Sequence, residues 1–174
     1  IQNDRATQPE ALAAAYLGEA VPETPEGYDA LVVLGGEQSA LDDAAYPYLP
    51  ELAALMRRFG DSGRSVLGIC LGSQLLARAY GAENHIGTAP EFGWCTVSTT
   101  QEGAADPVLS AAAGAFPIFQ WHGDSFDLPA GAQLLASSEH CRHQAFSVGS
   151  LHLAMQFHCE ITADKITDWT TSTE

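Results

Sequence analysis

The stretch "VLGICLGSQLLA", residues 66–77, decides how the chain folds. Residues 66–69 form a short apolar run typical of a buried strand, and residues 71–80 have the pattern of a helix that ends at Gly81. Gly68 and Gly72 flank Cys70 and give G-x-C-x-G, the thiol version of a strand–turn–helix nucleophile elbow. A residue without a Cβ lets the turn be sharp enough to push the middle side chain outward.

Two interpretations of Cys70 follow from this stretch alone. In the first, the N–H groups and positive end of the next helix favour the thiolate, which is the attacking species, so Cys70 is a nucleophile. In the second, Cys70 is a small buried residue at a glycine-rich turn, a common place for a free cysteine. The choice depends on what the rest of the chain supplies.

The first half of the chain alternates between helices and strands, and the second half is rich in strands. Residues 8–17 suit a helix, residues 30–34 suit a buried strand, and residues 50–59 suit an amphipathic helix stopped by Gly60. Further strands are expected at 94–99, 117–121, 132–136, 144–148 and 152–157. This order predicts an α/β fold with a mostly parallel central sheet flanked by helices and a small antiparallel extension.

Composition limits the classes of protein that fit. The 174 residues suit one domain over 1–174, and because the chain begins at Ile1 we expect the start of its first strand to be missing. A formal charge of −15 repels phosphate backbones, so no nucleic-acid partner is expected. No apolar run approaches the roughly 20 residues of a membrane span, and no export signal is apparent, which predicts a cytoplasmic protein without a membrane partner.

We expect no metal site and no cofactor. Without CxxC spacing or an export signal, neither a disulfide framework nor a structural zinc site is expected. The four cysteines are Cys70, Cys95, Cys141 and Cys159.

Two further features are suited to chemistry at Cys70. In "AMQFHCE", His158 and Glu160 lie two residues apart at a predicted strand end, so the carboxylate can orient the imidazole; the alternative is a strand-end histidine beside a solvated glutamate. Gly35-Gly36 follows another strand, where a backbone N–H can join that of Leu71 in stabilising an oxyanion; the alternative is an ordinary turn.

Together these features resemble the class I, triad-type glutamine amidotransferases, most closely stand-alone members related to the glutaminase domain of GMP synthase. The matching stretches are "VVLGGEQS" (32–39), "VLGICLGSQLLA" (66–77), "FQWHGDSFDLP" (119–129) and "AMQFHCEIT" (154–162). The resemblance implies a three-layer, flavodoxin-like sheet. It also implies that Cys70 attacks the side-chain amide of glutamine, forms a thioester and releases ammonia, and that water then releases glutamate.

By the same resemblance, His158 is the general base and acid and Glu160 orients it. The backbone N–H groups of Gly36 and Leu71 would form the oxyanion hole. The substrate-binding residues implied are Gly35, Gln74 and Asp124. For Gln74 the alternative is a helix-surface position, and for Asp124 it is a turn-stabilising residue.

Two residues depart from the family pattern: Cys159 replaces the proline after the histidine, and Glu37 replaces the proline after the glycine pair. A glutamate near the thiol would raise its pKa if it pointed inward. The resemblance implies L-glutamine or a γ-glutamyl amide as substrate and a synthetase partner in trans that consumes the ammonia. A γ-glutamyl peptidase or hydrolase on the same fold and a non-catalytic regulatory module are the alternatives.

Overall fold

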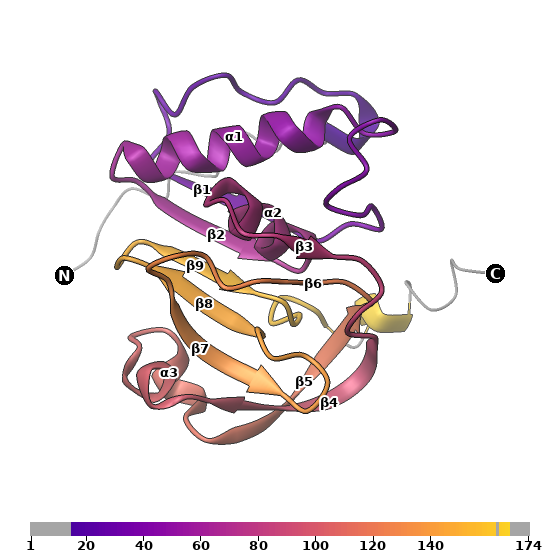
Figure 1. The fold of residues 1–174 in the computed structure, drawn as a ribbon, viewed down its shortest axis with the longest axis vertical. Helices are drawn as coiled ribbons and strands as arrows, with labels where there is room; N and C mark the ends of the chain where they lie inside the picture. The colour runs from indigo at the N-terminus through magenta and orange to yellow at the C-terminus, as the bar shows by residue number, and fades with distance from the viewer. Residues whose placement is uncertain (1–14, 163, 168–174) are drawn as a thin grey trace.

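The computed structural model describes residues 15–162 and 164–167, and its centre is a seven-stranded sheet in the order β1-β2-β9-β8-β7-β4-β5 (Figure 1). The strands of this sheet are β1 (Ala30–Val33), β2 (Ser65–Ile69), β4 (Glu91–Thr99), β5 (Ala115–His122), β7 (Gln133–Ser138), β8 (Ala145–Val148) and β9 (His152–Met155). A second, two-stranded sheet pairs β3 (Asn84–His85) with β6 (Ser125–Phe126). The helices are η1 (Ala15–Leu17), α1 (Tyr48–Asp61), α2 (Leu71–Ala79), α3 (Gln101–Ala105) and η2 (Leu109–Ala112).

The large sheet has a parallel part and an antiparallel part. Strands β1, β2 and β9 pair in parallel, whereas every later pair, from β9–β8 to β4–β5, is antiparallel. Since two antiparallel steps restore direction, β7 and β5 point the same way as the three parallel strands, so most of the sheet does run in one direction. The antiparallel part is larger than the small extension expected, because the short links from β7 to β8 to β9 permit only antiparallel neighbours.

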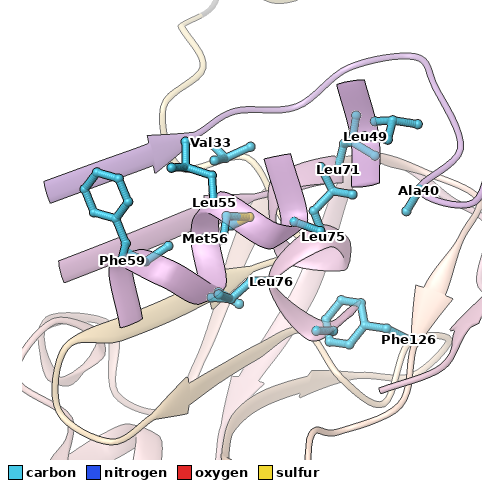
Figure 2. Packing of buried hydrophobic residues seen from close by; sticks show 14 of the residues in the cluster. Val33, Ala40, Leu49, Leu55, Met56, Phe59, Leu71, Leu75, Leu76 and Phe126 are labelled. Carbon is cyan, nitrogen blue, oxygen red and sulfur yellow. The ribbon is translucent and has the colours of Figure 1, made fainter. Parts of the chain in front are cut away.

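Helices α1 and α2 lie together beside the parallel strands, and α3 lies at the opposite end of the sheet next to β7 (Figure 1). Figure 2 shows the core that α1 and α2 form with the sheet, in which Leu55, Met56 and Phe59 of α1 belong to one buried cluster with Leu75 and Leu76 of α2. A second apolar cluster, built around Val97, Leu135 and Phe157, includes Leu109 of η2. The expected α/β architecture with flanking helices is therefore confirmed.

The predicted helix stop at Gly60 is wrong, because α1 continues to Asp61. A Cβ at position 60 would collide with the Tyr80 hydroxyl, so the glycine makes room for a neighbouring side chain instead of ending the helix. The residue that leaves the helix is Gly63, whose φ of +73° favours glycine.

The bounds of the other predicted elements shift by a few residues, and some elements of the structure were not predicted. Most of the predicted helix at 8–17 lies outside the described residues, which retain only η1 of it. Helix α3 and the β3–β6 pair were not predicted, because each is too short to show a hydrophobic period. Among the described residues, no helix has both the length and the apolar character to cross a bilayer.

Candidate functional site

Three neighbouring parallel strands end at one edge of the sheet, and each leads directly into one of the predicted pieces of the site. Strand β1 leads to Gly35 and Gly36, β2 to Cys70, and β9 to the segment that holds His158. The carboxyl ends of parallel strands are the usual place for a site in such a sheet. The fold thus brings together residues from positions 35, 70 and 158.

Cys70 occupies the predicted turn between strand and helix in a strained conformation. Its φ of +52° makes it the only non-glycine residue with positive φ in the part of the chain that the structure describes. The Cys70 N–H donates to the Met155 carbonyl at 2.8 Å, which joins the elbow to β9. A Cβ on Gly68 would meet the backbone of Gly72, and a Cβ on Gly72 would meet the Val33 carbonyl. Glycine is therefore required at both positions, because the backbone of neighbouring segments lies too close for a side chain.

His158 lies beyond the end of β9, so the predicted reason for its meeting Glu160 is wrong. The strand ends at Met155, and residues 158 and 160 do not share a strand face. Instead, the His158 N–H donates to the Phe119 carbonyl of β5 at 2.9 Å, and this bridge holds the segment. The two side chains still meet: His158 Nδ1 lies 2.7 Å from Glu160 Oε1.

The surroundings of the His158 imidazole favour its protonated form. Burial opposes the charge, but hydrogen bonds to Cys70 and Glu160, and the negative charges of both, outweigh it and raise the pKa of His158 to about 9. His158 is only 4% exposed, so these partners act with little screening by water. Cys70, His158 and Glu160 thus place a sulfur, an imidazole with a raised pKa and a carboxyl group next to one another.

The glycine pair lies against the reacting groups. A Cβ on Gly35 would stand 3.2 Å from both Cys70 Cβ and His158 Cε1, and a Cβ on Gly36 would stand 3.2 Å from Leu71 Cδ2. Gly36 is therefore adjacent to Leu71, the residue whose N–H was predicted to be the other oxyanion donor. An isolated turn does not require such contacts, and the lack of side chains here leaves room next to the sulfur.

The two predicted substrate-binding side chains differ in their surroundings. Gln74 is buried, which makes the helix-surface alternative wrong, and its Nε2 donates to Gln156 Oε1 at 3.1 Å. The Asp124 carboxylate accepts a hydrogen bond from the Gly87 N–H at 2.8 Å, so it ties two loops together. The end of β5, just before this turn, approaches the nucleophile: the Trp121 carbonyl lies 3.9 Å from Cys70 Sγ.

A buried polar network behind this turn was not predicted. The Glu91 carboxylate of β4 accepts from His122 Nε2 at 3.1 Å, from Ser138 Oγ at 2.7 Å and from Gln144 Nε2 at 2.5 Å. Burial lowers the pKa of His122, while the Asp124 carbonyl and Glu91 favour its charged form. These residues come from four separate segments, and no local sequence spacing could have signalled them.

Glu91, His122 and Cys141 also present ligand atoms within 4.8 Å of one another, close enough to share one metal ion. Burial raises the pKa of the Cys141 thiol to about 11, so the sulfur keeps its proton. Glu91 and His122 already hydrogen-bond each other. A metal ion would have to displace these protons, and the hydrogen bonds account for the cluster without one.

The two departures from the family pattern lie at the periphery of the site. Cys159 is exposed, and its Sγ lies 3.7 Å from Met155 Sδ. Burial of its sulfur, followed by the charge of Glu160, raises the pKa of the Cys159 thiol. Glu37 is exposed, so the inward orientation that would have disturbed Cys70 is not adopted.

Comparison with known proteins places this geometry in a family. The model of the family described as glutamine amidotransferase class-I matches residues 13–167. The glutamine amidotransferase-like protein YfeJ of Salmonella typhimurium is 33% identical over 154 residues, which are 87% of this chain and 64% of YfeJ. One subunit of the glutamine-hydrolyzing GMP synthase of Sulfurisphaera tokodaii is 31% identical over 156 residues, 84% of this chain and 79% of that protein.

A solved structure agrees with these relatives. The crystal structure of a glutamine amidotransferase from Thermotoga maritima superposes with a TM-score of 0.81 at 33% sequence identity, over 90% of this chain and 66% of that one. The chain thus spans just under two thirds of the length of both YfeJ and the Thermotoga protein.

Proposed function

The chain belongs to the class I glutamine amidotransferases, and on this premise we propose that it hydrolyses the side-chain amide of L-glutamine through a thioester on Cys70. One observation carries the proposal: Cys70 stands on a strained elbow with a raised-pKa histidine, His158, hydrogen-bonded to Glu160. A buried structural cysteine needs neither the positive φ nor the charged partner.

In the first half of the proposed reaction, the Cys70 thiolate adds to the amide carbon of glutamine. The carbonyl oxygen takes up the negative charge, and the N–H groups of Gly36 and Leu71 stabilise it. The His158 imidazolium gives its proton to the amide nitrogen, the C–N bond breaks, and ammonia leaves. Glu160 keeps the imidazole oriented and stabilises its charged form. The product of this half is a γ-glutamyl thioester.

In the second half, water attacks the thioester and His158, now neutral, accepts a proton from it. The C–S bond breaks, the Cys70 thiolate is restored, and glutamate leaves after its new carboxyl group releases the remaining proton of the water to solvent. Gly35, Gln74 and Asp124 are proposed to hold the substrate beside the sulfur. For Gly35 this is supported by its closeness to both Cys70 and His158. For Asp124 the support is its place directly after β5, the strand whose Trp121 carbonyl lies 3.9 Å from Cys70 Sγ.

We further propose that the ammonia passes to a synthetase on a separate chain in the cytoplasm, and that the domain requires no cofactor. The relative from Sulfurisphaera tokodaii is named as one subunit of a GMP synthase, which supports an acceptor on another subunit. The four free thiols suit a reducing compartment. Measuring whether the activity rises when cell extract fractions are added would test for such a partner.

The test of the hydrolysis is direct. The purified chain is incubated with L-glutamine, and glutamate and ammonia are measured, with Cys70→Ala as the variant and Cys95→Ala as the matched control. We expect one ammonia per glutamate, complete loss in Cys70→Ala and no change in the control. A diazoketone analogue of glutamine should add one label to the Cys70 peptide. Unchanged activity in Cys70→Ala, or labelling at another cysteine, would refute the assignment.

A second candidate, a hydrolase of larger γ-glutamyl amides, is supported by aromatic residues that extend away from His158. The Phe119 ring lies 6.4 Å from that of His158, and Phe92 and Trp94, 63% and 69% exposed, pack against Phe119. A leaving amine protonated by His158 would emerge toward this strip. Comparing kcat/KM for glutamine and for a γ-glutamyl amide of an aromatic amine decides: a preference for the amide by orders of magnitude selects the second candidate.

A further inference from the structure

We propose that Glu91 and His122 are positioning residues, a buried pair that holds the turn at 121–124 against Cys70 and thereby sets the affinity for glutamine. The inference rests on the proposed function and concerns residues that lie behind the reacting groups. Both belong to the antiparallel part of the sheet, where Glu91 of β4 is the register partner of His122 of β5.

The Glu91 carboxylate is fixed on several sides. Its side chain is 2% exposed and that of His122 is 1% exposed, so neither is solvated. Besides His122, the carboxylate accepts hydrogen bonds from Ser138 Oγ and Gln144 Nε2. A buried carboxylate with three donors has a single favourable position. It is therefore a rigid anchor for the histidine.

The His122 imidazole connects this anchor to the turn. Its Nε2 lies 3.1 Å from Glu91 Oε2, and its Nδ1 lies 3.0 Å from the Asp124 carbonyl. Both ring nitrogens thus face oxygen acceptors, whereas a neutral imidazole carries only one N–H. Two protons, shared between the imidazole and the Glu91 carboxyl group, are needed to make both contacts.

The position of the turn matters because it borders the nucleophile. The Trp121 carbonyl, at the end of β5, lies 3.9 Å from Cys70 Sγ, so this strand end and the turn that follows it border the space beside the sulfur. On its outer side the turn is tied by the Asp124 carboxylate to the Gly87 N–H, at an exposed site. The His122 contact is the buried one, and displacements of about 1 Å at a reacting centre are costly.

The same network reaches the helix that follows the nucleophile. The Gln144 carbonyl accepts from the Gln156 N–H at 2.8 Å, and Gln156 Oε1 accepts from Gln74 Nε2 at 3.1 Å. Gln74 lies on α2, four residues after Cys70. The pair is therefore linked to two segments next to Cys70: directly to the turn at 121–124, and through Gln144 and Gln156 to helix α2.

Two variants of His122 separate the contact with the turn from the contact with the anchor. The amide nitrogen of His122→Asn takes the place of Nδ1 and keeps the bond to the Asp124 carbonyl. That of His122→Gln takes the place of Nε2 and keeps only the bond to Glu91. We expect His122→Gln to raise the KM for glutamine about tenfold or more with kcat changed less, and His122→Asn to raise it about threefold. His152→Asn, which changes a histidine beside Tyr80 at the far end of β9, should leave the KM unaltered.

Alkylation of Cys70 by iodoacetamide gives a second readout that does not need turnover. Without glutamine, the rate should match the wild type in both variants, because Cys70 and His158 are intact. With glutamine, the concentration that protects Cys70 should rise in parallel with the KM. Should neither His122 variant fold, Ser138→Ala removes one donor to Glu91 and should raise the same two quantities about twofold.

The outcomes separate the two proposals. A wild-type chain that neither hydrolyses glutamine nor is protected by it refutes the proposed function, and this inference with it. A wild-type chain with normal turnover refutes the positioning role alone if the variants lose thermal stability but keep the KM and the protecting concentration. Equal losses in His122→Asn and His122→Gln also refute it, since the bond to the turn would then have no separate effect.

Discussion

The parallel and antiparallel parts of the sheet fix their contributions to the site in opposite ways. In the parallel part, close contacts favour glycine: a Cβ on Gly68 or Gly72 would collide with backbone, and a Cβ on Gly35 would press on the Cys70 and His158 side chains. In the antiparallel part, buried side chains do it, through hydrogen bonds that converge on Glu91. The first part should therefore be sensitive to added atoms and the second to lost donors.

The most severe test of this difference is to substitute alanine for a glycine in each part of the sheet. A Cβ on Gly72 would collide with the Val33 carbonyl, and a Cβ on Gly103 of α3 would collide with the Leu135 carbonyl of β7. Each alanine variant should lose about 3 kcal/mol of unfolding free energy, because backbone must move apart. Urea denaturation measures the loss.

The two glycine variants should differ at the nucleophile. Gly72→Ala displaces the elbow, so alkylation of Cys70 and glutamine hydrolysis should both fall at least tenfold under folding conditions. Gly103→Ala should leave both near the wild-type rate, since α3 contacts β7 and β4 and not the elbow. Equal loss of reactivity in the two variants would contradict the division of the site into two parts.

The next prediction concerns the carboxylate that supports His158. Glu160→Gln should lower hydrolysis roughly 100-fold, because the imidazolium loses its ionic partner and its orientation. Its pKa, raised to about 9 in the wild type, should fall, so that activity declines at a lower pH as His158 loses the proton it gives to ammonia. A pH–rate profile of both proteins measures the shift, and an unmoved alkaline limb would argue against the pair.

The same imidazolium makes stability depend on pH. Since the folded pKa of His158 lies above the value near 6.5 of an unfolded histidine, its contribution is complete below pH 6.5. The contribution is lost as the pH rises through about 9. Glu160→Gln should flatten this dependence, which thermal unfolding at pH 6 and at pH 9.5 can detect.

The sequence predicted the parallel part well because its signals are local. The elbow at Cys70 and the glycines at 35 and 36 each follow an apolar run, and adjacent parallel strands bring such ends together. The meeting of His158 with Glu160 was predicted for the wrong reason, because the bridge to Phe119 that holds the segment connects residues 39 positions apart. Spacing cannot show such a long-range hydrogen bond.

The antiparallel network had no comparable signal. Glu91, His122 and Gln144 are separated by 20 residues or more, and each alone has the pattern of an ordinary strand or loop residue. Their convergence depends on the order β7-β4-β5, which places β4 between two strands that both follow it in the chain. Buried polar residues at strand ends were the available clue, and burial could not be judged before the register was known.

A milder steric test compares Gly35, which follows β1, with Gly123, which follows β5. A Cβ on Gly35 would stand 3.2 Å from Cys70 Cβ and His158 Cε1, whereas a Cβ on Gly123 would meet nothing within 4 Å. Gly35→Ala should slow hydrolysis about tenfold with little change in unfolding free energy, because the methyl group pushes on the reacting pair. Gly123→Ala should behave like the wild type. Steady-state kinetics decides, and a slow Gly123→Ala would mean that the turn needs glycine for another reason.

The smallest effect concerns the loop that follows the glycine pair, where the parallel part does use side chains. Arg78 of α2 makes two bonds to Asp43, at 2.7 and 2.6 Å, and one to the Ala40 carbonyl at 2.7 Å. Both side chains are partly exposed, so Arg78→Ala should cost about 1 kcal/mol of unfolding free energy and leave the KM for glutamine unchanged. A double-mutant cycle with Asp43→Ala measures the coupling. A coupling well above 1 kcal/mol, or a raised KM, would show that the parallel part also depends on a pair of polar side chains, as the antiparallel part does on Glu91 and His122.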